Sequence, residues 1–535
     1  MPSLPTAHIL PRLSTLAVLF AVLLAARLLG AHFMYFYQGD EVSLAAGVSA
    51  LVSHNELANI YRYGPQVGYY RLVQLIDVVI GGSPRWIPHI MITLSALTGA
   101  IIPVCGLALF PSILSRAERW VLVGLLAANP ILWMSSTYGS STMPATALLV
   151  MAVTVLSLRP ARAPEIAALA MFGAGVLVRA DTILAAPVIG LLLWQRYDDM
   201  RAVAIRVTPL ALVIGGIYLA LATTDPRMAS SAEDVARHLT NPTPTKFWEY
   251  LLWSTSPFVF ICAIVGVTDL ASVRRHLLWT MAVWCLPFFA FYYGATTSPR
   301  YFIPTVVPVA ICGAVGALML ARVLAPHRTR AARVVIGALC AAPLFVGLGW
   351  FSSSSPKNLL TESQFETHVG PMWTGAFLYK TYFTPGILVR SVRNTGFGRS
   401  SHTEYALDSS LAAVASGALR QHTIVVLMGG WNGHVFHYYA NVHGARYTSQ
   451  LPGPNSNSEA WMDLGGARLM SIRRDEPRYL ERATLPVAAD DQIWIIAWTA
   501  EAELNVRSKV PVGLALSLVN GADRPVRQYT LRAAQ

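Results

Sequence analysis

The stretch Gly39-Asp40-Glu41 carries the clearest chemical potential in this chain, because two adjacent carboxylates follow directly on its first apolar run. Ionisable groups beside a membrane span are costly and are by default a sign of function. A positioned carboxylate takes the proton of an attacking hydroxyl, so we expect Asp40 to act as a general base, with Glu41 as a support or metal ligand. The alternative is that both acids only cap a helix that begins near Val42.

A second candidate site lies at Arg300 and Tyr301, where a late apolar run begins after Ser298-Pro299. An arginine at the mouth of a span, between prolines that fix the backbone, holds a phosphate with two parallel hydrogen bonds. The alternative is an arginine that extends its charged end toward the membrane surface. The sequence therefore predicts an anion-binding arginine here or a simple interfacial one.

Two further groups are candidates for the lining of a polar cavity. Tyr61, Arg62 and Tyr63 combine aromatic faces that stack on a sugar with a cation that binds phosphate, although an interfacial aromatic belt has the same composition. Arg179 and Asp181 lie between two short apolar runs and form either a mutual ion pair, which we favour, or part of the cavity.

Composition restricts the class of protein that positions these residues. The chain has 535 residues, 54% of them apolar and 13% charged. Soluble domains carry about a quarter charged residues, so we expect a polytopic membrane protein. The net charge of +12 comes largely from arginines in short loops between apolar runs. This distribution indicates membrane topology and anionic lipid head groups, and not nucleic acid.

Runs of about 17 to 25 apolar residues span the hydrocarbon core, and we count about eleven such runs. They cover residues 13–35, 86–109, 118–134, 142–158, 164–179, 181–195, 205–222, 256–269, 277–293, 301–322 and 333–351. With the N-terminus inside, the inner loops are rich in arginine, as the positive-inside bias requires. Asp40, Glu41, Arg300 and the C-terminal region then face outside, and we expect a multi-pass protein of the bacterial inner (plasma) membrane.

The chain divides by composition into a transmembrane domain, residues 1–351, and a soluble domain on the periplasmic side, residues 352–535. Residues 42–57 and 67–80 have apolar residues at helical spacing and predict two interfacial helices in the first outside loop. Residues 423–428, 493–498 and 514–519 predict strands, and residues 411–419 a helix. We expect an α/β or α+β fold of unread strand order for the soluble domain.

Taken together, these stretches resemble the GT-C superfamily of membrane glycosyltransferases, in particular the branch of protein O-mannosyltransferases and lipid A aminoarabinose transferases. The resemblance covers roughly residues 10–320 and depends on the order of several short motifs. These motifs are Arg27, Gly39-Asp40-Glu41, Tyr63-Gly64-Pro65, Gly81-Gly82, Asn129-Pro130 and Arg300-Tyr301 with Pro304 and Pro308.

The resemblance implies a GT-C-like helical fold, a polyprenyl-phosphate-linked sugar as donor, an acceptor hydroxyl on the outer face, and inversion at the anomeric carbon. It implies that Asp40 is the catalytic base and that Arg300 contacts the donor phosphate, with Glu41, Arg62 and Tyr63 lining the cavity. The acceptor is a lipid, a glycan or a protein. Where some relatives have an acidic residue after the third span, this chain has residues 140–143, Ser-Ser-Thr-Met. No metal ligand is therefore assigned, and dependence on a divalent metal stays open.

Two other classes of function compete with sugar transfer by Asp40. An O-antigen ligase or polymerase also uses polyprenyl donors, but relies on outer loops rich in arginine and histidine. A non-enzymatic transporter of lipid-linked glycans predicts broken helices in pairs and charges near the membrane midplane. The unusual charges of this chain cluster at the outer edge of the membrane instead, which favours the glycosyltransferase.

Overall fold

The computed structural model of the chain contains two compact units. The first comprises Met1–Met34, Tyr63–Tyr69 and Ile92–Asn394, and the second Tyr35–Arg62, Tyr70–Met91 and Thr395–Gln535. The structure describes residues 12–32, 39–54, 66–137, 139–158, 162–224, 247–248, 251, 255–294, 299–327, 329–345, 408, 410–416, 423–428, 432–450, 460–472, 485, 487–496, 500–520 and 526–534. The predicted domain boundary after residue 351 lies outside these residues and stays a prediction.

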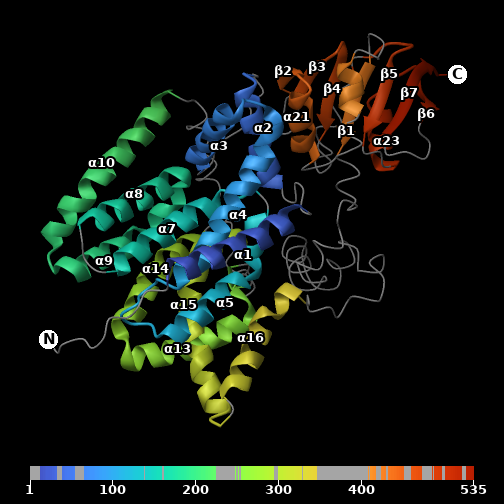
Figure 1. Cartoon of the computed structure of the whole chain (residues 1–535). Coiled ribbons are helices and arrows are strands. Elements are labelled where there is room, and N and C mark those ends of the chain that lie inside the picture. Colours follow the sequence, from blue (N-terminus) through green and yellow to red (C-terminus); the bar gives the residue numbers. More distant parts are fainter. Residues whose placement is uncertain are drawn as a thin grey trace. The chain divides into compact units, whose positions relative to one another are not determined.

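The first unit is helical (Figure 1). Its elements are α1 (Leu13–His32), most of α4 (Ile87–Gly106), α5 (Arg116–Ala127), α6 (Pro130–Thr137), α7 (Thr142–Ser157), α8 (Arg162–Val178), η4 (Ala180–Ala185), α9 (Ala186–Tyr197), α10 (Met200–Thr224), α13 (Pro257–Val273), α14 (Arg275–Tyr293), η5 (Pro299–Phe302), α15 (Ile303–Leu324) and α16 (Thr329–Phe345).

Every predicted span contains a helix, but the helices differ in length. In the described part of the chain, four helical segments are long and apolar enough to cross a membrane: Pro84–Gly106, Met200–Leu221, Arg275–Tyr293 and Arg300–Leu324. A fifth is added if α5 and the bent helix after it form one broken span. The described residues therefore contain several helices able to span a membrane, as in a multi-pass membrane protein. The count of eleven spans stays a prediction.

The predicted span at residues 118–134 is not one straight helix. It divides into α5 and α6, whose axes are bent by 62°. The cause lies in Asn129 and Pro130. Oδ1 of Asn129 accepts hydrogen bonds from the backbone N–H groups of Ile131 (3.1 Å) and Leu132 (3.0 Å), which caps a new helix. Pro130 has no N–H to continue the preceding helix and is well suited to a first helical position.

Helices α13 and α15 approach each other at two glycines. A Cβ atom on Gly266 of α13 would overlap the carbonyl oxygen of Cys312, and a Cβ on Gly316 of α15 would overlap the carbonyl oxygen of Cys262. Small residues at a helix interface let two backbones come this close, which is how membrane helices gain packing contacts. This contact holds α15, the helix that follows Arg300, against its neighbour.

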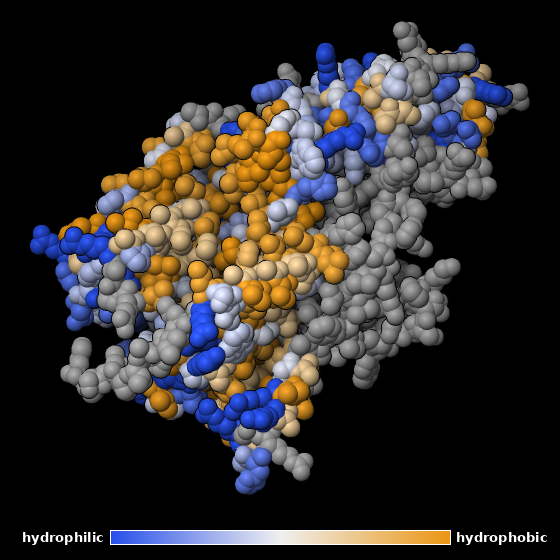
Figure 2. All heavy atoms as spheres, viewed as in Figure 1, coloured by the Kyte–Doolittle hydropathy of each residue, from blue (hydrophilic) through white to orange (hydrophobic). Residues whose placement is uncertain are grey.

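On the face drawn in Figure 2, much of the surface of the helical unit is apolar. Helix α10 exposes Ile205, Leu212, Val213 and Leu219, which would be unusual for a soluble domain. Hydrophilic side chains are concentrated instead on the strands and at helix ends (Figure 2). An exposed apolar surface of this kind is suited to contact with the hydrocarbon chains of lipids.

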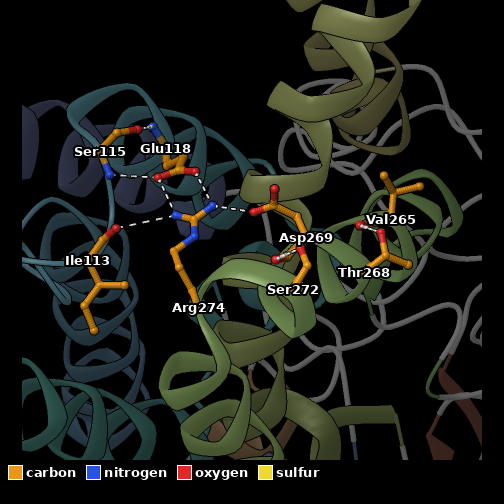
Figure 3. A network of polar contacts seen from close by, with 8 residues as sticks. All are labelled: Ile113, Ser115, Glu118, Val265, Thr268, Asp269, Ser272 and Arg274. Carbon is orange, nitrogen blue, oxygen red and sulfur yellow. Dashed lines mark hydrogen bonds and ion pairs between the residues drawn. The ribbon is translucent and has the colours of Figure 1, made fainter.

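One guanidinium joins three helices at a corner of this unit (Figure 3). Arg274 lies between α13 and α14, and its Nη2 donates to Oε1 of Glu118 at 2.9 Å and to Oδ2 of Asp269 at 2.7 Å. Glu118 also forms a capping box with Ser115 at the start of α5. Burial lowers the pKa of Arg274, but the two carboxylates outweigh it and raise the pKa. We call this cluster the Arg274 corner.

The second unit combines helices with a mixed sheet. Its helices are α2 (Gly39–Val52), most of α3 (Val67–Ile80), η3 (Pro84–Trp86), α21 (Asn432–Val442) and α23 (Ala500–Arg507). Its strands are β1 (Thr423–Met428), β2 (Arg446–Gln450), β3 (Ala460–Leu464), β4 (Ala467–Ile472), β5 (Gln492–Ile496), β6 (Leu514–Asn520) and β7 (Val526–Ala533).

The seven strands are ordered β2-β3-β4-β1-β5-β7-β6. β1 is central and parallel to β4 and β5, whereas the outer pairs are antiparallel. Ile493, Ile495 and Leu531 are fully buried in a core that includes Val506 of α23. This mixture confirms that helices and strands combine in the C-terminal region, and it supplies the strand order that the sequence left unread.

Candidate functional site

The turn between α8 and η4 carries the first part of the site. Helix α8 ends at Val178, and Arg179 then adopts an extended conformation (φ −150°, ψ 114°). Nε of Arg179 lies 2.9 Å from Oδ1 of Asp181, and both side chains are largely buried. A buried guanidinium needs such a partner, and the predicted ion pair is confirmed.

An aromatic pair from two other elements completes this cluster. The hydroxyl of Tyr292, near the end of α14, donates a hydrogen bond of 2.6 Å to Oδ2 of Asp181. Its ring stacks on Tyr301 of η5, with ring centres 5.3 Å apart and planes inclined by 13°. The guanidinium carbon of Arg179 lies 5.4 Å from the centre of the Tyr301 ring, and that of Arg300 lies 5.5 Å from it. The ring of Tyr301 thus contacts both cations.

The structure therefore brings together four predicted residues, Arg179, Asp181, Arg300 and Tyr301. Arg300 is 92% buried, which differs from the alternative of an arginine extended into water. Arg179 is thus paired with a carboxylate within the cluster, and Arg300 places a second guanidinium beside the same ring.

Three residues of this cluster were not predicted. Nη1 of Arg179 donates to Oγ of Ser141 at 3.1 Å, and that hydroxyl donates in turn to Oε1 of Gln66. Ser141 lies in the segment where the resemblance leads one to expect an acid, which was the one signal in its favour. Tyr292 lies in an aromatic run that reads as an ordinary span, and Gln66 has no distinguishing pattern.

The predicted base is located on the second unit. Asp40 and Glu41 are the second and third residues of α2, so their backbones lie at the N-terminus of that helix. Their side chains lie outside the described residues, as do Tyr61, Arg62 and Tyr63. The predicted roles of all five residues are therefore still predictions.

Helix α2 is held by the C-terminal part of the chain, which sequence reasoning missed. Nδ2 of Asn441 on α21 donates to Oγ of Ser49 and, at 3.0 Å, to Oγ of Ser53. The hydroxyl of Tyr438 on the same helix donates to the carbonyl oxygen of Pro84 at 3.2 Å. Helix α2, whose second residue is the candidate base, is therefore joined to α21 by two side-chain hydrogen bonds, of which the one to Ser49 is buried.

Arg27 of α1 is another residue on which the resemblance depends. It is fully buried, and its guanidinium carbon lies 5.2 Å from the centre of the Trp133 ring. Gly99 gives it room, because a Cβ there would lie 2.9 Å from Nε of Arg27. Over the described ranges, no group of three or more His, Cys, Asp or Glu residues is placed to hold a metal. Metal dependence at Asp40 and Glu41 is not tested by this.

Comparison with known proteins gives the fold its class. No family model matches the chain, and no curated protein matches it by sequence. Among solved structures, ArnT from Cupriavidus metallidurans bound to undecaprenyl phosphate matches with a TM-score of 0.57 at 11% identity. The match covers 97% of this chain and 98% of ArnT. The apo form of the same enzyme matches with a TM-score of 0.54 at 13% identity, over 96% and 98% of the two chains.

This likeness covers nearly the whole of both chains. The chain therefore has an ArnT-like fold, as the order of the sequence motifs predicted.

Proposed function

We propose that this protein is a membrane glycosyltransferase that moves a sugar from a polyprenyl-phosphate donor to an acceptor hydroxyl on the outer face of the bacterial inner membrane. The observation that carries the proposal is the fold, shared over 97% of the chain with ArnT, whose solved structure holds undecaprenyl phosphate. The acid pair at the start of α2 and the arginines beside Tyr301 supply groups that such a reaction needs.

In the proposed reaction, the acceptor oxygen attacks the anomeric carbon from the face opposite the phosphate. The new glycosidic bond forms as the bond between the anomeric carbon and the phosphate oxygen breaks, so the configuration inverts. Asp40 takes the acceptor proton, and Glu41 supports that carboxylate. The polyprenyl phosphate leaves with the electron pair. The protein has to orient the acceptor, remove one proton and stabilise the departing charge.

We assign the stabilisation of that charge to Arg300. The buried Arg300 guanidinium has the planar geometry that holds two phosphate oxygens at once. Arg179, already paired with Asp181, also contacts the ring of Tyr301 and is proposed as a positioning residue. Tyr61, Arg62 and Tyr63 are proposed to contact the sugar or the phosphate of the donor.

The test uses the full-length protein in lipid nanodiscs and measures undecaprenyl phosphate released from a panel of undecaprenyl-phosphate sugars. Asp40→Asn is nearly isosteric but removes the base, so we expect turnover to fall by roughly 10²- to 10⁴-fold, the usual contribution of a general base. Asp463→Asn, an exposed acid on β3, is the matched control. Unchanged turnover in Asp40→Asn would remove that residue from its role, and no transfer from any donor by the wild type would reject the proposed activity.

The acceptor is a separate question. Mass analysis of cell-envelope glycans, lipids and proteins from a deletion strain, compared with the strain carrying Asp40→Asn, identifies the molecule that loses a sugar. A molecule missing in both strains is the product of the reaction. An envelope unchanged in the deletion strain would contradict a transferase that acts there.

A further inference from the structure

Ser141 is the N-cap residue of α7, but its side chain forms no capping hydrogen bond. Serine is preferred at this position because its hydroxyl accepts a hydrogen bond from a backbone N–H group of the first turn, which stabilises the helix. Ser115 shows the usual arrangement in this protein, since it caps α5 and its Oγ accepts from the N–H of Glu118 at 3.3 Å. Ser141 therefore lacks a local stabilisation, as residues at functional sites often do, and its other contacts indicate what it does instead.

The hydroxyl of Ser141 lies between two side chains from distant parts of the sequence. It accepts a hydrogen bond of 3.1 Å from Nη1 of Arg179 and donates one to Oε1 of Gln66. A hydroxyl has one proton to donate and lone pairs with which to accept, so both bonds form at once. We call the side chains of Gln66, Ser141 and Arg179, joined by these two hydrogen bonds, the Ser141 bridge.

Both ends of the Ser141 bridge are fixed within the helical unit. Before α7, the N–H of Ser140 donates to Oγ of Ser95 on α4 at 2.8 Å, and that hydroxyl lies 3.2 Å from the carbonyl oxygen of Ser140. At the start of α3, a Cβ atom on Gly68 would overlap the carbonyl oxygen of Leu177 near the end of α8. The absence of a side chain at Gly68 thus lets the backbone beside the bridge pack directly on α8.

The Ser141 bridge restricts the orientation of the guanidinium of Arg179. Nε of Arg179 is held by Asp181, and this contact alone leaves the planar group able to rotate about it. The hydrogen bond from Nη1 to Ser141 fixes a second point and with it the plane of the guanidinium. The same guanidinium contacts the ring of Tyr301, which in turn contacts Arg300. The contacts therefore run without a break from Ser141 to the arginine assigned to the donor phosphate.

We propose that Ser141 and Gln66 are positioning residues for the donor phosphate, which orient Arg179 and, through the ring of Tyr301, set the place of Arg300. The inference rests on the proposed function, because it assigns both residues to the phosphate site of that reaction. Loss of the bridge weakens the hold on the phosphate more than it affects removal of the acceptor proton.

The test is steady-state kinetics of the full-length protein in nanodiscs. The donor is the undecaprenyl-phosphate sugar with the highest turnover, and undecaprenyl phosphate serves as a competitive product inhibitor. Ser141→Ala removes both hydrogen bonds. The donor KM and the inhibition constant should rise together by roughly three- to tenfold, while kcat changes by less than about twofold. Because the inhibitor has no sugar, a rise in its constant places the defect at the phosphate. Ser141→Thr keeps the hydroxyl and should return both constants close to those of the wild type.

Gln66→Met tests the far end of the Ser141 bridge. Methionine has a similar length but lacks the acceptor oxygen, so the bond between Ser141 and Arg179 stays and both constants should rise less than in Ser141→Ala. In the double variant the constants should equal those of Ser141→Ala alone, since Gln66 acts through that hydroxyl. A double variant in which the two effects add would contradict a shared bridge.

Ser115→Ala is the matched control, because it removes the hydroxyl of an N-cap serine away from the site. It should lower the unfolding midpoint through loss of its cap and leave both constants unchanged, whereas Ser141→Ala loses no cap. If both constants were unchanged in Ser141→Ala while the wild type transferred sugar, the inference would be wrong and the proposed function would stand. No transfer by the wild type would reject the proposed function and this inference with it.

Discussion

The hydroxyl of Tyr292 donates a hydrogen bond of 2.6 Å to Asp181, a residue 111 positions away that also pairs with Arg179. One carboxylate thus joins α14 to the turn after α8, and through the stacked ring of Tyr292 it fixes Tyr301. Because Tyr301 contacts both Arg179 and Arg300, the geometry of the candidate phosphate site depends on this carboxylate.

Asp181→Asn is expected to destabilise the protein. The change leaves the buried guanidinium of Arg179 without its counter-charge, which in buried pairs costs about 3–5 kcal/mol. Tyr292→Phe keeps the stacked ring and loses one hydrogen bond, so we expect a smaller loss of about 1–3 kcal/mol. Thermal unfolding of both variants in detergent, followed by tryptophan fluorescence, shows which variant loses more stability. If Asp181→Asn were as stable as the wild type, the ion pair between Arg179 and Asp181 would not contribute to stability.

Arg300→Ala is expected to raise the KM for the polyprenyl-phosphate donor roughly tenfold or more, because charge-assisted hydrogen bonds to phosphate contribute about 1.5–3 kcal/mol. Arg300→Lys keeps the charge but loses the planar two-point contact and should be intermediate. Steady-state kinetics at varied donor and fixed acceptor distinguish these cases. Arg330→Ala, on the exposed first turn of α16, is the control. A defect confined to the KM of the acceptor would contradict the assignment.

Asn441→Ala tests the link between α21 and the candidate base. Removing the amide leaves the hydroxyls of Ser49 and Ser53 without that donor, at a cost of about 1–3 kcal/mol. Because Ser49 lies on α2, whose second residue is Asp40, and Ser53 directly follows that helix, we expect a fall in kcat of up to about a hundredfold with little change in donor KM. Asn520→Ala, exposed on β6, should leave both unchanged. If kcat were unchanged in Asn441→Ala, α21 would not position the base.

The carboxyl of Asp77 predicts a pH dependence. It is fully buried in α3, and among the described residues neither of its oxygens has a hydrogen-bond partner. Burial raises its pKa above 3.8. The folded protein therefore keeps this proton to higher pH than the unfolded chain does. Stability associated with Asp77 is complete below pH 3.8 and is lost as the pH rises through the raised pKa.

Asp77→Asn removes this titration. Unfolding midpoints measured between pH 4 and 8 should fall less steeply with pH in the variant than in the wild type, and at pH 8 the variant should be the more stable. Exposed Asp463 serves as the control, since its replacement by Asn should keep the wild-type slope. Parallel profiles for wild type and Asp77→Asn would show that Asp77 does not titrate in this range.

Local patterns predicted much of the fold, and contacts between distant segments account for most of what was missed. Strand β1 has the predicted bounds, and β6 differs from prediction by one residue at its end. Strands β3 and β4 were missed because charged and polar residues interrupt their short apolar stretches. The bend before α6 was missed because an average over an apolar run does not register Asn129 and Pro130, although both residue types indicate a helix start.

The candidate site divides in the same way. The pair Arg179 and Asp181 was predictable because the two residues are two positions apart and both are costly to bury alone. Nothing in the sequence joins Asp181 to Tyr292 or Asn441 to Ser49, since these pairs depend on how helices far apart in the chain pack. The order of the short motifs, by contrast, predicted the ArnT-like fold, although the sequence identity to ArnT is only 11–13%.

The Arg274 corner has a consequence for how the protein is made. Glu118 and Arg274 are 156 residues apart, so the ribosome releases the start of α5 long before the guanidinium exists. Before Arg274 has been synthesised, the carboxylate of Glu118 can form only the capping-box hydrogen bond with Ser115. A nascent chain stopped before residue 274 therefore lacks the ion pair that joins the start of α5 to the turn between α13 and α14.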